Sequence, residues 1–253
     1  CKKVGIEYFT SPYDFDSVDL VDPYVDIYKI GSGDISWLNI VEYVLKKGKP
    51  TIIATGASEL DDVKRVMDLA QSITNKIVLM QCNTNYTGSK ENFKYCNLNV
   101  LRLYNELYPN VILGLSDHTP GHSTVLGSIA LGARVFEKHF TDDNNQEGPD
   151  HSFAMNPISW KDMVERSYEL LHSLGDGHKR VEDNEKQSYV VQRRCLCARV
   201  DLKAGHLIKK SDLIPLRPIG NNSFQPYEIS SIVGKTLTND LLAGEHLKKQ
   251  DIK

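Results

Sequence analysis

Two histidines carry the strongest chemical signal in this chain of 253 residues. One lies in SDHT at residues 116–119 and the other in EKHFT at residues 137–141, and each follows a short apolar run. Adjacent strands of a barrel can bring two such imidazoles to one ion, and neutral imidazole suits Mn, Fe, Co or Zn. Water and substrate oxygens would fill the other positions, as in catalytic metal sites. The pattern favours a catalytic metal held by His118 and His139.

Two other interpretations of this region are weaker. A lone histidine at a strand end is usually a hydrogen-bonding residue, but here two occupy matching positions on neighbouring strands. A serine hydrolase triad is disfavoured because Ser116, Asp117 and His118 are consecutive, and successive side chains of a strand point to opposite faces.

A second motif, KIGSGD at residues 29–34, ends another apolar run. Its glycines let backbone amides approach a ligand, Ser32 supplies a hydroxyl, and Lys29 supplies a compact positive charge suited to phosphate or carboxylate. A purely structural turn is the alternative interpretation.

Further hydrogen-bonding groups follow two more runs, in ATGAS at 54–58 and in QCNTNYT at 81–87. Amides, hydroxyls and a phenol, among them Asn83, Thr84 and Tyr86, suit a hydroxyl-rich ligand or a phosphate, although they are also ordinary turn residues. Asp150 could accept hydrogen bonds from substrate hydroxyls or cap its loop. Arg217 precedes a proline, and an exposed arginine is usually solvated unless an anionic site lies beside it.

The elements that must position these residues follow from the apolar pattern. Short apolar runs alternate with stretches of helical spacing such as Ile40, Val41, Val44 and Leu45, which predicts β/α units around a parallel sheet. In such folds the chemistry lies at the C-terminal ends of the strands. The predicted strands occupy residues 3–9, 25–29, 50–54, 77–81, 111–115 and 134–138.

Composition excludes several classes of protein. A net charge of −3 gives no electrostatic case for nucleic acid, and no apolar stretch approaches the roughly 20 residues that span a bilayer. We therefore expect a cytoplasmic protein that binds neither nucleic acid nor membrane. Five cysteines without CxxC spacing argue against a disulfide framework or structural zinc, and Cys195 and Cys197 are typical of packing along a strand.

The chain divides into two expected domains. Residues 1–175 form the β/α domain, with a long polar loop at 141–151 and a helix at about 159–174, and residues 176–190 form a charged linker. Residues 191–253 form a small α+β module, in which 201–213 aligns without gaps to 240–252. We expect two copies of a strand, a glycine turn and a short helix, too poor in apolar residues to be very stable alone.

The first residue is Cys1, which lies within or beside a predicted strand. Six β/α units do not close an eight-stranded barrel. The expectation is therefore either an open sheet or a barrel from which about two N-terminal units are absent.

Taken together, these strings resemble the sialic acid synthase family, which includes the legionaminic and pseudaminic acid synthases. The resemblance covers essentially the whole chain and ends in an antifreeze-like (SAF) module with Arg217 and Pro218. Its ordered motifs are FTSPY at 9–13, YKIGSGD at 28–34, CNTNY at 82–86, SDHT at 116–119, EKHFT at 137–141 and GPD at 148–150.

The resemblance implies a (β/α)8 TIM barrel with a C-terminal SAF (β-clip) domain. It also implies that phosphoenolpyruvate condenses with an N-acylated mannose-type sugar to give a nine-carbon nonulosonic acid and phosphate. The implied cofactor is a divalent metal, commonly Mn²⁺, with Mg²⁺ or Co²⁺ as alternatives. The implied assembly is a homodimer in which the SAF domain of one subunit caps the active site of the other.

Site roles carry over from the family by position. His118 and His139 would hold the metal, and Arg217 would meet the sugar in the partner subunit. The implied phosphoenolpyruvate ligands are Lys29, Ser32, Ser11 and Ser116, with Asn83 and Thr84 near the phosphate. The residues implied to face the sugar are Asp34, Tyr86 and Asp150.

The chain departs from the family pattern at several positions. Ala54 stands where some members have serine, Thr84 where some have asparagine, and Asp34 where glutamate is frequent. A carboxylate and a phosphate-binding lysine come, in the family, from the first two barrel units. We therefore expect the 253-residue chain by itself to show no turnover.

Two alternatives remain. One is another metal-dependent barrel enzyme, such as an aldolase or a 3-deoxy-sugar-acid synthase that uses phosphoenolpyruvate, but these lack the SAF module. The other is a non-catalytic sugar-binding protein, against which the retained His118 and His139 count. The acceptor sugar is not fixed, although CNTNY at 82–86 favours the legionaminic-type or other bacterial members.

Overall fold

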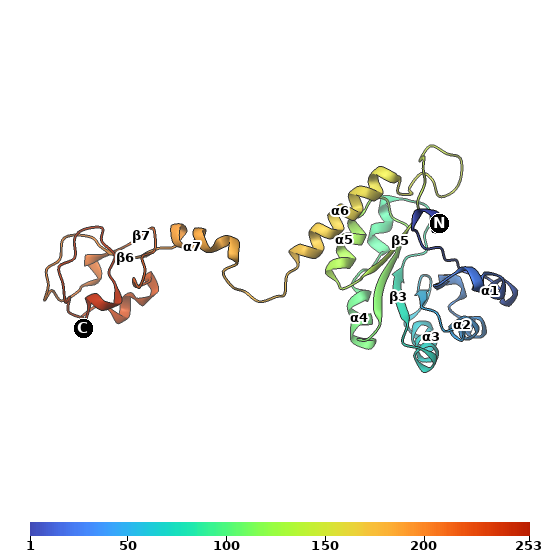
Figure 1. The fold of residues 1–253 in the computed structure, drawn as a ribbon, viewed down its shortest axis with the longest axis horizontal. Helices are drawn as coiled ribbons and strands as arrows, with labels where there is room; N and C mark the ends of the chain where they lie inside the picture. Colours follow the sequence, from blue (N-terminus) through green and yellow to red (C-terminus); the bar gives the residue numbers. More distant parts are fainter. The chain divides into compact units, whose positions relative to one another are not determined.

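The computed structural model describes residues 1–253, with the side chain of Lys2 set aside, and divides into two compact units (Figure 1). The first unit is residues 1–176 and the second is residues 177–253. No helix of the described residues is both long and apolar enough to cross a membrane.

The first unit is a parallel sheet in which neighbouring strands are also consecutive in the chain, and helices connect them. This order produces a curled half-barrel with an inner and an outer face, and it confirms five of the expected strands. The strands are β1 Tyr28–Ile30, β2 Thr51–Ala54, β3 Ile77–Cys82, β4 Ile112–Asp117 and β5 Val135–Lys138. The α-helices are α1 Phe15–Val21, α2 Leu38–Leu45, α3 Leu60–Ile73, α4 Val100–Leu107, α5 Ser123–Ala130 and α6 Pro157–Ser173. The 3-10 helices are η1 Lys2–Val4, η2 Asp22–Tyr24, η3 Ser32–Asp34 and η4 Lys90–Tyr95.

The strand predicted at residues 3–9 is wrong. Residues 2–4 form η1, and the nearest bridge to the sheet follows the segment and joins Thr10 to Tyr28. Its apolar side chains face solvent, with Val4 72% and Ile6 62% exposed. A strand needs a partner along its length, and β1 has only three residues to offer.

Side chains of the strands alternate between two apolar layers. Ile53, Leu79 and Leu113 point outward into the main core, which the helices cover. Ile52 and Met80 belong to a separate inner cluster. The inner layer supports the groups that follow at the C-terminal ends of the strands.

Gly114 lies on the inner face of β4, beside Met80 of β3 and Val135 of β5. A Cβ at this position would lie 2.7 Å from the backbone oxygen of Val135 and 2.9 Å from Cγ of Met80. Backbone cannot move aside as a flexible side chain can, so only glycine fits between these strands.

The second unit has its own small core, formed by residues such as Leu196, Ile208 and Leu247. Its sheet pairs β6 Cys195–Ala198 with β7 Leu213–Leu216 in antiparallel register. The remaining elements are η5 Asp183–Glu185, α7 Lys186–Gln192, η6 Lys210–Asp212, η7 Pro226–Ser231 and η8 Lys249–Asp251.

The repeated segments of the second unit hold each other. Leu202 bridges Leu241, the amide of Ala204 donates to Oδ1 of Asp240 (2.9 Å), and the amide of Ala243 donates to Oδ1 of Asp201 (2.8 Å). Both glycine turns have φ of +85°, and both copies end in a short 3-10 helix, η6 or η8. The predicted repeat is confirmed, with single bridges in place of full strands.

We predict that Gly114→Ala lowers the free energy of unfolding of the first unit by about 1–3 kcal/mol, because the new methyl group meets backbone. The control is Gly33→Ala, whose Cβ would have no atom within 4 Å. Both tryptophans of the chain, Trp37 and Trp160, lie in the first unit, so tryptophan fluorescence during urea unfolding reports on that unit. Equal unfolding midpoints for Gly114→Ala and wild type would contradict the argument.

Candidate functional site

The candidate site lies at the C-terminal ends of β4 and β5, on the inner face of the half-barrel. Ser116 and Glu137 are register partners, and each is followed two residues later by a histidine, His118 or His139. Because every second residue of a strand points to the same face, these four side chains share the inner face.

The two histidines lie side by side, with ring centroids 5.1 Å apart. Nδ1 of His118 is 2.9 Å from the backbone oxygen of Asn83, and Nδ1 of His139 is 3.2 Å from Oδ2 of Asp150. Both partners are acceptors, so each Nδ1 carries the proton and each Nε2 keeps its lone pair. Acceptors behind Nδ1 are the usual support of histidines that ligate metal through Nε2. The pair fits a divalent metal.

Burial lowers the pKa of both imidazoles below the ordinary value, and for His139 the neighbouring His118 adds to the effect of burial while Asp150 opposes it. Both rings are therefore neutral at neutral pH. A neutral imidazole is the form that binds metal.

Aromatic side chains hold the histidine rings in place. The ring of Tyr86 lies 4.3 Å from that of His118, and the ring of Phe153 lies 5.2 Å from that of His139. Gly88, with φ of +64°, lets Phe153 approach, since a Cβ there would lie 2.5 Å from Cβ of Phe153. Tyr86 remains half exposed and forms an open wall of the site.

Beside the histidines lies a cluster of charge and hydroxyl. Nζ of Lys29 is 2.7 Å from Oε1 of Glu137, which also accepts a hydrogen bond of 3.0 Å from Oγ of Ser116. The cluster is partly open to solvent, so the lysine can exchange its carboxylate partner for an anionic ligand. Our sequence interpretation missed Glu137, although its alternation with His139 on one strand was a usable signal.

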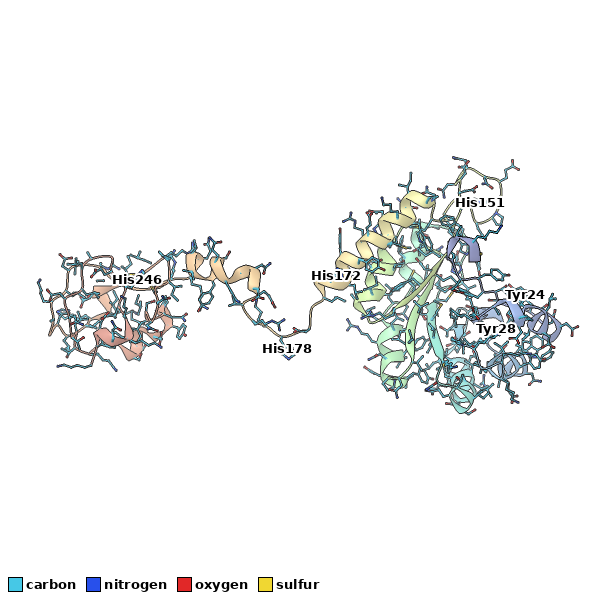
Figure 2. The ribbon with its side chains drawn as sticks, viewed as in Figure 1. Tyr24, Tyr28, His151, His172, His178 and His246 are labelled. Carbon is cyan, nitrogen blue, oxygen red and sulfur yellow. The ribbon has the colours of Figure 1, made fainter. Side chains whose placement is uncertain are left out.

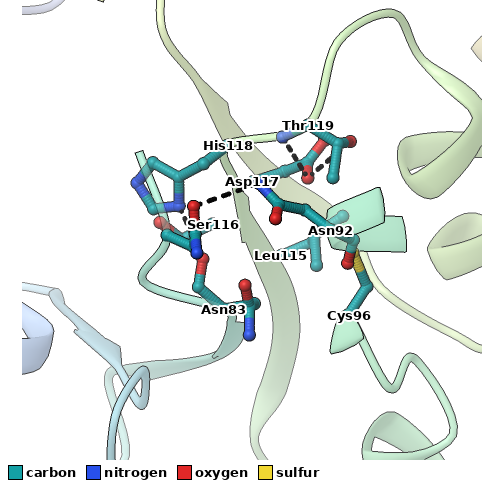
Figure 3. A pocket seen from close by; sticks show the side chains of 9 residues that line it. Asn83, Asn92, Cys96, Leu115, Ser116, Asp117, His118 and Thr119 are labelled. Carbon is teal, nitrogen blue, oxygen red and sulfur yellow. Dashed lines mark hydrogen bonds between the residues drawn. The ribbon is translucent and has the colours of Figure 1, made fainter. Parts of the chain in front are cut away.

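A second ion pair lies on the opposite face of the same strands. Lys138 of β5 contacts Oδ2 of Asp117 on β4, and Nζ also donates to the backbone oxygen of Thr119 (2.7 Å). Oγ1 of Thr119 donates to the carboxylate of Asp117 (Figure 3). Oγ1 of Thr124 on α5 donates to the same carboxylate. With both charged side chains 3% exposed or less, this network is structural and locks the turn that presents His118.

The ends of the first three strands converge beside this site. The amide of Gly56 donates to Oγ of Ser32 (2.9 Å), and a Cβ at Gly56 would lie 1.8 Å from Oγ1 of Thr84. Ser32 and Thr84 therefore both lie close to Gly56. Asn83 contributes its backbone oxygen to His118, while its side-chain amide donates to the backbone oxygen of Tyr95 (3.4 Å).

The other expected residues lie as follows. Ser11 is half-buried and follows the bridge at Thr10, and Asp34 is half-buried at the end of η3. Asp150 contacts His139, which gives it a supporting role for the imidazole. Arg217 is exposed and belongs to the second unit.

The long loop after β5 is tied down by its own hydrogen bonds. His151 lies on this loop (Figure 2). Oγ1 of Thr141 is 2.8 Å from Nδ1 of His151, and Nδ2 of Asn144 donates to the backbone oxygens of His151 and Ala154, both at 2.8 Å. These bonds fix the segment that carries Asp150 to His139.

Comparisons with known proteins agree with this geometry. A family model described as the NeuB family matches residues 1–179, and one described as the SAF domain matches residues 193–253. N,N'-diacetyllegionaminic acid synthase of Legionella pneumophila is 35% identical over 96% of this chain and 68% of its own length. Human N-acetylneuraminate-9-phosphate synthase is 28% identical over 92% of this chain and 64% of its own length.

Among solved structures, a protein of Chromobacterium violaceum has the same fold. It is titled putative spore coat polysaccharide biosynthesis protein E, with a TM-score of 0.77 and 23% identity over 100% of this chain and 75% of that one.

The two ion pairs of Lys138 and Lys29 should respond differently to mutation. We predict that Lys138→Met lowers the free energy of unfolding by about 3–5 kcal/mol, because Asp117 is left buried without its counter-charge. Lys29→Met should cost at most about 1 kcal/mol, because its pair is partly exposed. Urea unfolding followed by tryptophan fluorescence measures both. A similar loss in the two variants would refute the division into a structural and an exchangeable pair.

The lowered histidine pKa values predict a pH dependence of stability. An imidazole in the unfolded state has its ordinary pKa of 6.5, whereas in the folded state the pKa is lower. The unfolded state therefore binds more protons as the pH falls below 6.5. The contribution to stability is complete above that pH and is lost as the pH falls through the lowered folded-state pKa. Urea midpoints measured in chelator from about pH 7.5 to 5 should therefore fall toward acid. His118→Gln should flatten this slope, and the exposed His172→Gln should not. An unchanged slope in His118→Gln would contradict the prediction.

Proposed function

The chain belongs to the NeuB family, and from this premise we propose that it condenses phosphoenolpyruvate with an N-acylated mannose-type sugar. Its homologues are named legionaminic, pseudaminic and N-acetylneuraminate synthases. In the proposed reaction a bond forms between C3 of phosphoenolpyruvate and the sugar aldehyde carbon, water adds at C2, and phosphate leaves. The product is a nine-carbon nonulosonic acid.

One observation carries the proposal. His118 and His139 present two unprotonated nitrogens beside the anion-binding cluster of Lys29, Ser116 and Glu137. A site for an aldehyde oxygen and a site for a phosphate thus adjoin each other. An aldol-type condensation of an anionic enol with an aldehyde needs this combination.

Lys29 is the proposed phosphate ligand. On binding, its ammonium exchanges Glu137 for a phosphate oxygen, and Ser116 and Ser32 donate hydroxyl hydrogen bonds. Ser11, Asn83 and Thr84 complete the proposed phosphoenolpyruvate site. These donors stabilise the negative charge that phosphate carries as it leaves.

A divalent metal fits the histidine pair, and we propose Mn²⁺, with Mg²⁺ or Co²⁺ as alternatives. When bound it supplies Lewis-acid polarisation of the sugar aldehyde. Asp150 holds His139 in the tautomer that faces the ligand, while Tyr86 and Asp34 are the proposed contacts of the sugar.

We also propose that two further β/α units close the barrel between β5 and the segment at Thr10. The support is that β5 pairs with β4 along one edge, and that Thr10 is bridged to Tyr28 by a single contact. An open sheet edge leaves backbone amides and carbonyls unpaired. The proposed architecture is residues 1–175 in the barrel, 176–190 in the linker and 191–253 in the SAF domain.

The proposed assembly is a cytoplasmic homodimer in which the SAF domain of one subunit covers the site of the other. Arg217 supports this arrangement, because it is an exposed cation without an ion pair among the described residues. An anionic or hydroxylated ligand in the partner subunit would give it a role.

For the acceptor we propose the 2,4-diacetamido-2,4,6-trideoxymannose that leads to a legionaminic acid, with N-acetylmannosamine or its 6-phosphate as alternatives. The greater identity to the Legionella protein (35%) than to the human protein (28%) supports this choice.

The test is phosphate release from phosphoenolpyruvate by a chain that carries the proposed barrel units, with each of the three sugars in turn and with Mn²⁺ or chelator. We predict metal-dependent release that falls at least about 100-fold in His118→Ala, since loss of a group that stabilises developing charge costs this much. His172→Ala on α6 is the control and should keep full activity. The preferred sugar identifies the product.

Two outcomes would reject the proposal. Release that is unchanged in chelator or in His118→Ala would remove the proposed role of the histidine pair. A folded protein that binds Mn²⁺ but releases no phosphate with any of the three sugars would favour a non-catalytic sugar-binding protein.

A further inference from the structure

A second cluster of potential metal ligands lies in the other unit of the chain. Along β6, Leu196 and Ala198 point into the small core, so Cys195 and Cys197 share the opposite face. Both cysteines are 0% exposed. Two buried thiols are thus placed together where the hydrophobic core does not use them.

A histidine completes the cluster. His246 forms a backbone bridge with Cys197 and lies in the second copy of the repeat (Figure 2). One ligand atom from each of the three side chains lies within 4.8 Å of the other two. Among the described residues, no other group of three or more His, Cys, Asp or Glu side chains meets that limit.

The spacing of the sulfurs identifies the type of site. Sγ of Cys195 and Sγ of Cys197 are 3.9 Å apart. Two thiolates bound to one tetrahedral zinc ion at about 2.3 Å lie about 3.8 Å apart, whereas a disulfide needs about 2.05 Å. The thiols therefore have the separation of zinc ligands.

We propose that Cys195, Cys197 and His246 bind one zinc ion. Thiolate and imidazole are the ligands that zinc prefers, and a mixed set of two cysteines and one histidine leaves one position open. The backbone oxygen of Pro218, 3.5 Å from Sγ of Cys195, or a water would fill the fourth position. The proposal is independent of the function proposed for the first unit.

Gly220 fixes the imidazole of His246 at the site. A Cβ on Gly220 would lie 2.1 Å from Nδ1 and 3.0 Å from Cε1 of that ring. The ring is therefore packed directly on the backbone, and any side chain at position 220 would displace it.

The internal repeat provides a comparison within the same unit. Leu207 is the counterpart of His246, and it bridges Thr236 as His246 bridges Cys197. The repeat fold therefore forms with an aliphatic residue and a threonine at these two positions. The fold therefore does not require a thiol at Cys197 or an imidazole at His246. Metal binding would explain why these two residue types occur together.

Zinc at this site would join β6 to the second copy of the repeat, two segments about fifty residues apart in the chain. The small core of this unit limits its stability without such a link. The earlier interpretation of Cys195 and Cys197 as packing residues took no account of His246, which becomes their neighbour only in the folded chain.

Titration of the full 253-residue chain with Co²⁺, a spectroscopic substitute for zinc, tests the proposal. The background is Cys1→Ser, because Cys1 is exposed and could bind metal itself. We predict that one equivalent of Co²⁺ binds at the thiols and gives a thiolate charge-transfer band in the near ultraviolet, which zinc abolishes by displacement. The histidine pair of the first unit offers nitrogen ligands and would not give this band.

Variants decide which residues bind. Cys197→Ser should remove the band, and His246→Asn should weaken binding at least about 10-fold. His206→Asn, in the same unit but paired with Asp212, is the matched control and should bind like wild type. Because His246 is only half-buried, its variant should keep the fold, and circular dichroism in chelator checks this.

Two results would overturn the assignment. A fully reduced wild-type chain without the charge-transfer band would mean that the thiols only pack. Equal affinity in wild type and in a folded His246→Asn variant would exclude the imidazole as a ligand. Zinc should also raise the thermal midpoint of the second unit in wild type and not in His246→Asn, which separates binding at this site from binding elsewhere.

Discussion

Side chains alternate between the two faces of a parallel strand, and the arrangement of the candidate site depends on this alternation. In β4 and β5 the register pairs Ser116 with Glu137 on the inner face and Asp117 with Lys138 on the outer face. The histidines that follow each strand continue the inner series. A shift of register by one residue would turn Ser116, Glu137 and the two histidines toward the helices and the buried ion pair toward the inner face.

The two lysine–carboxylate ion pairs differ in their exposure to solvent, and this gives them different roles. Lys138 and Asp117 are almost completely removed from water, so separating the two charges costs much free energy and the pair stays formed. Lys29 and Glu137 keep contact with solvent, so an anion can compete for the lysine at little cost. Two neighbouring residues of β5 thus belong to different kinds of ion pair. Glu137 is in the exchangeable pair, and Lys138 is in the rigid one.

The sequence predicted most of this architecture, and the failures have physical causes. The buried strands and both histidines could be identified because burial and alternation leave a local pattern, as in β3 or at His118. The segment 3–9 has that pattern but lacks paired neighbours, which a local pattern cannot reveal. Glu137 was missed, and the contact of Asp150 with His139 was not foreseen, because both depend on partners that only the fold brings near, Lys29 for one and the His139 ring for the other.

In the second unit, an aspartate of each repeat copy accepts a hydrogen bond from the turn of the other copy, and this constrains when the unit can fold during synthesis. Asp201 and Ala243 are 42 residues apart, and Ala204 and Asp240 are 36 apart. Each turn is completed by the other copy, so the chain between the two copies must bring them together before either hydrogen bond can form. The first copy therefore cannot reach its final structure while the second is still inside the ribosome, and this unit folds only after nearly all of its residues have emerged.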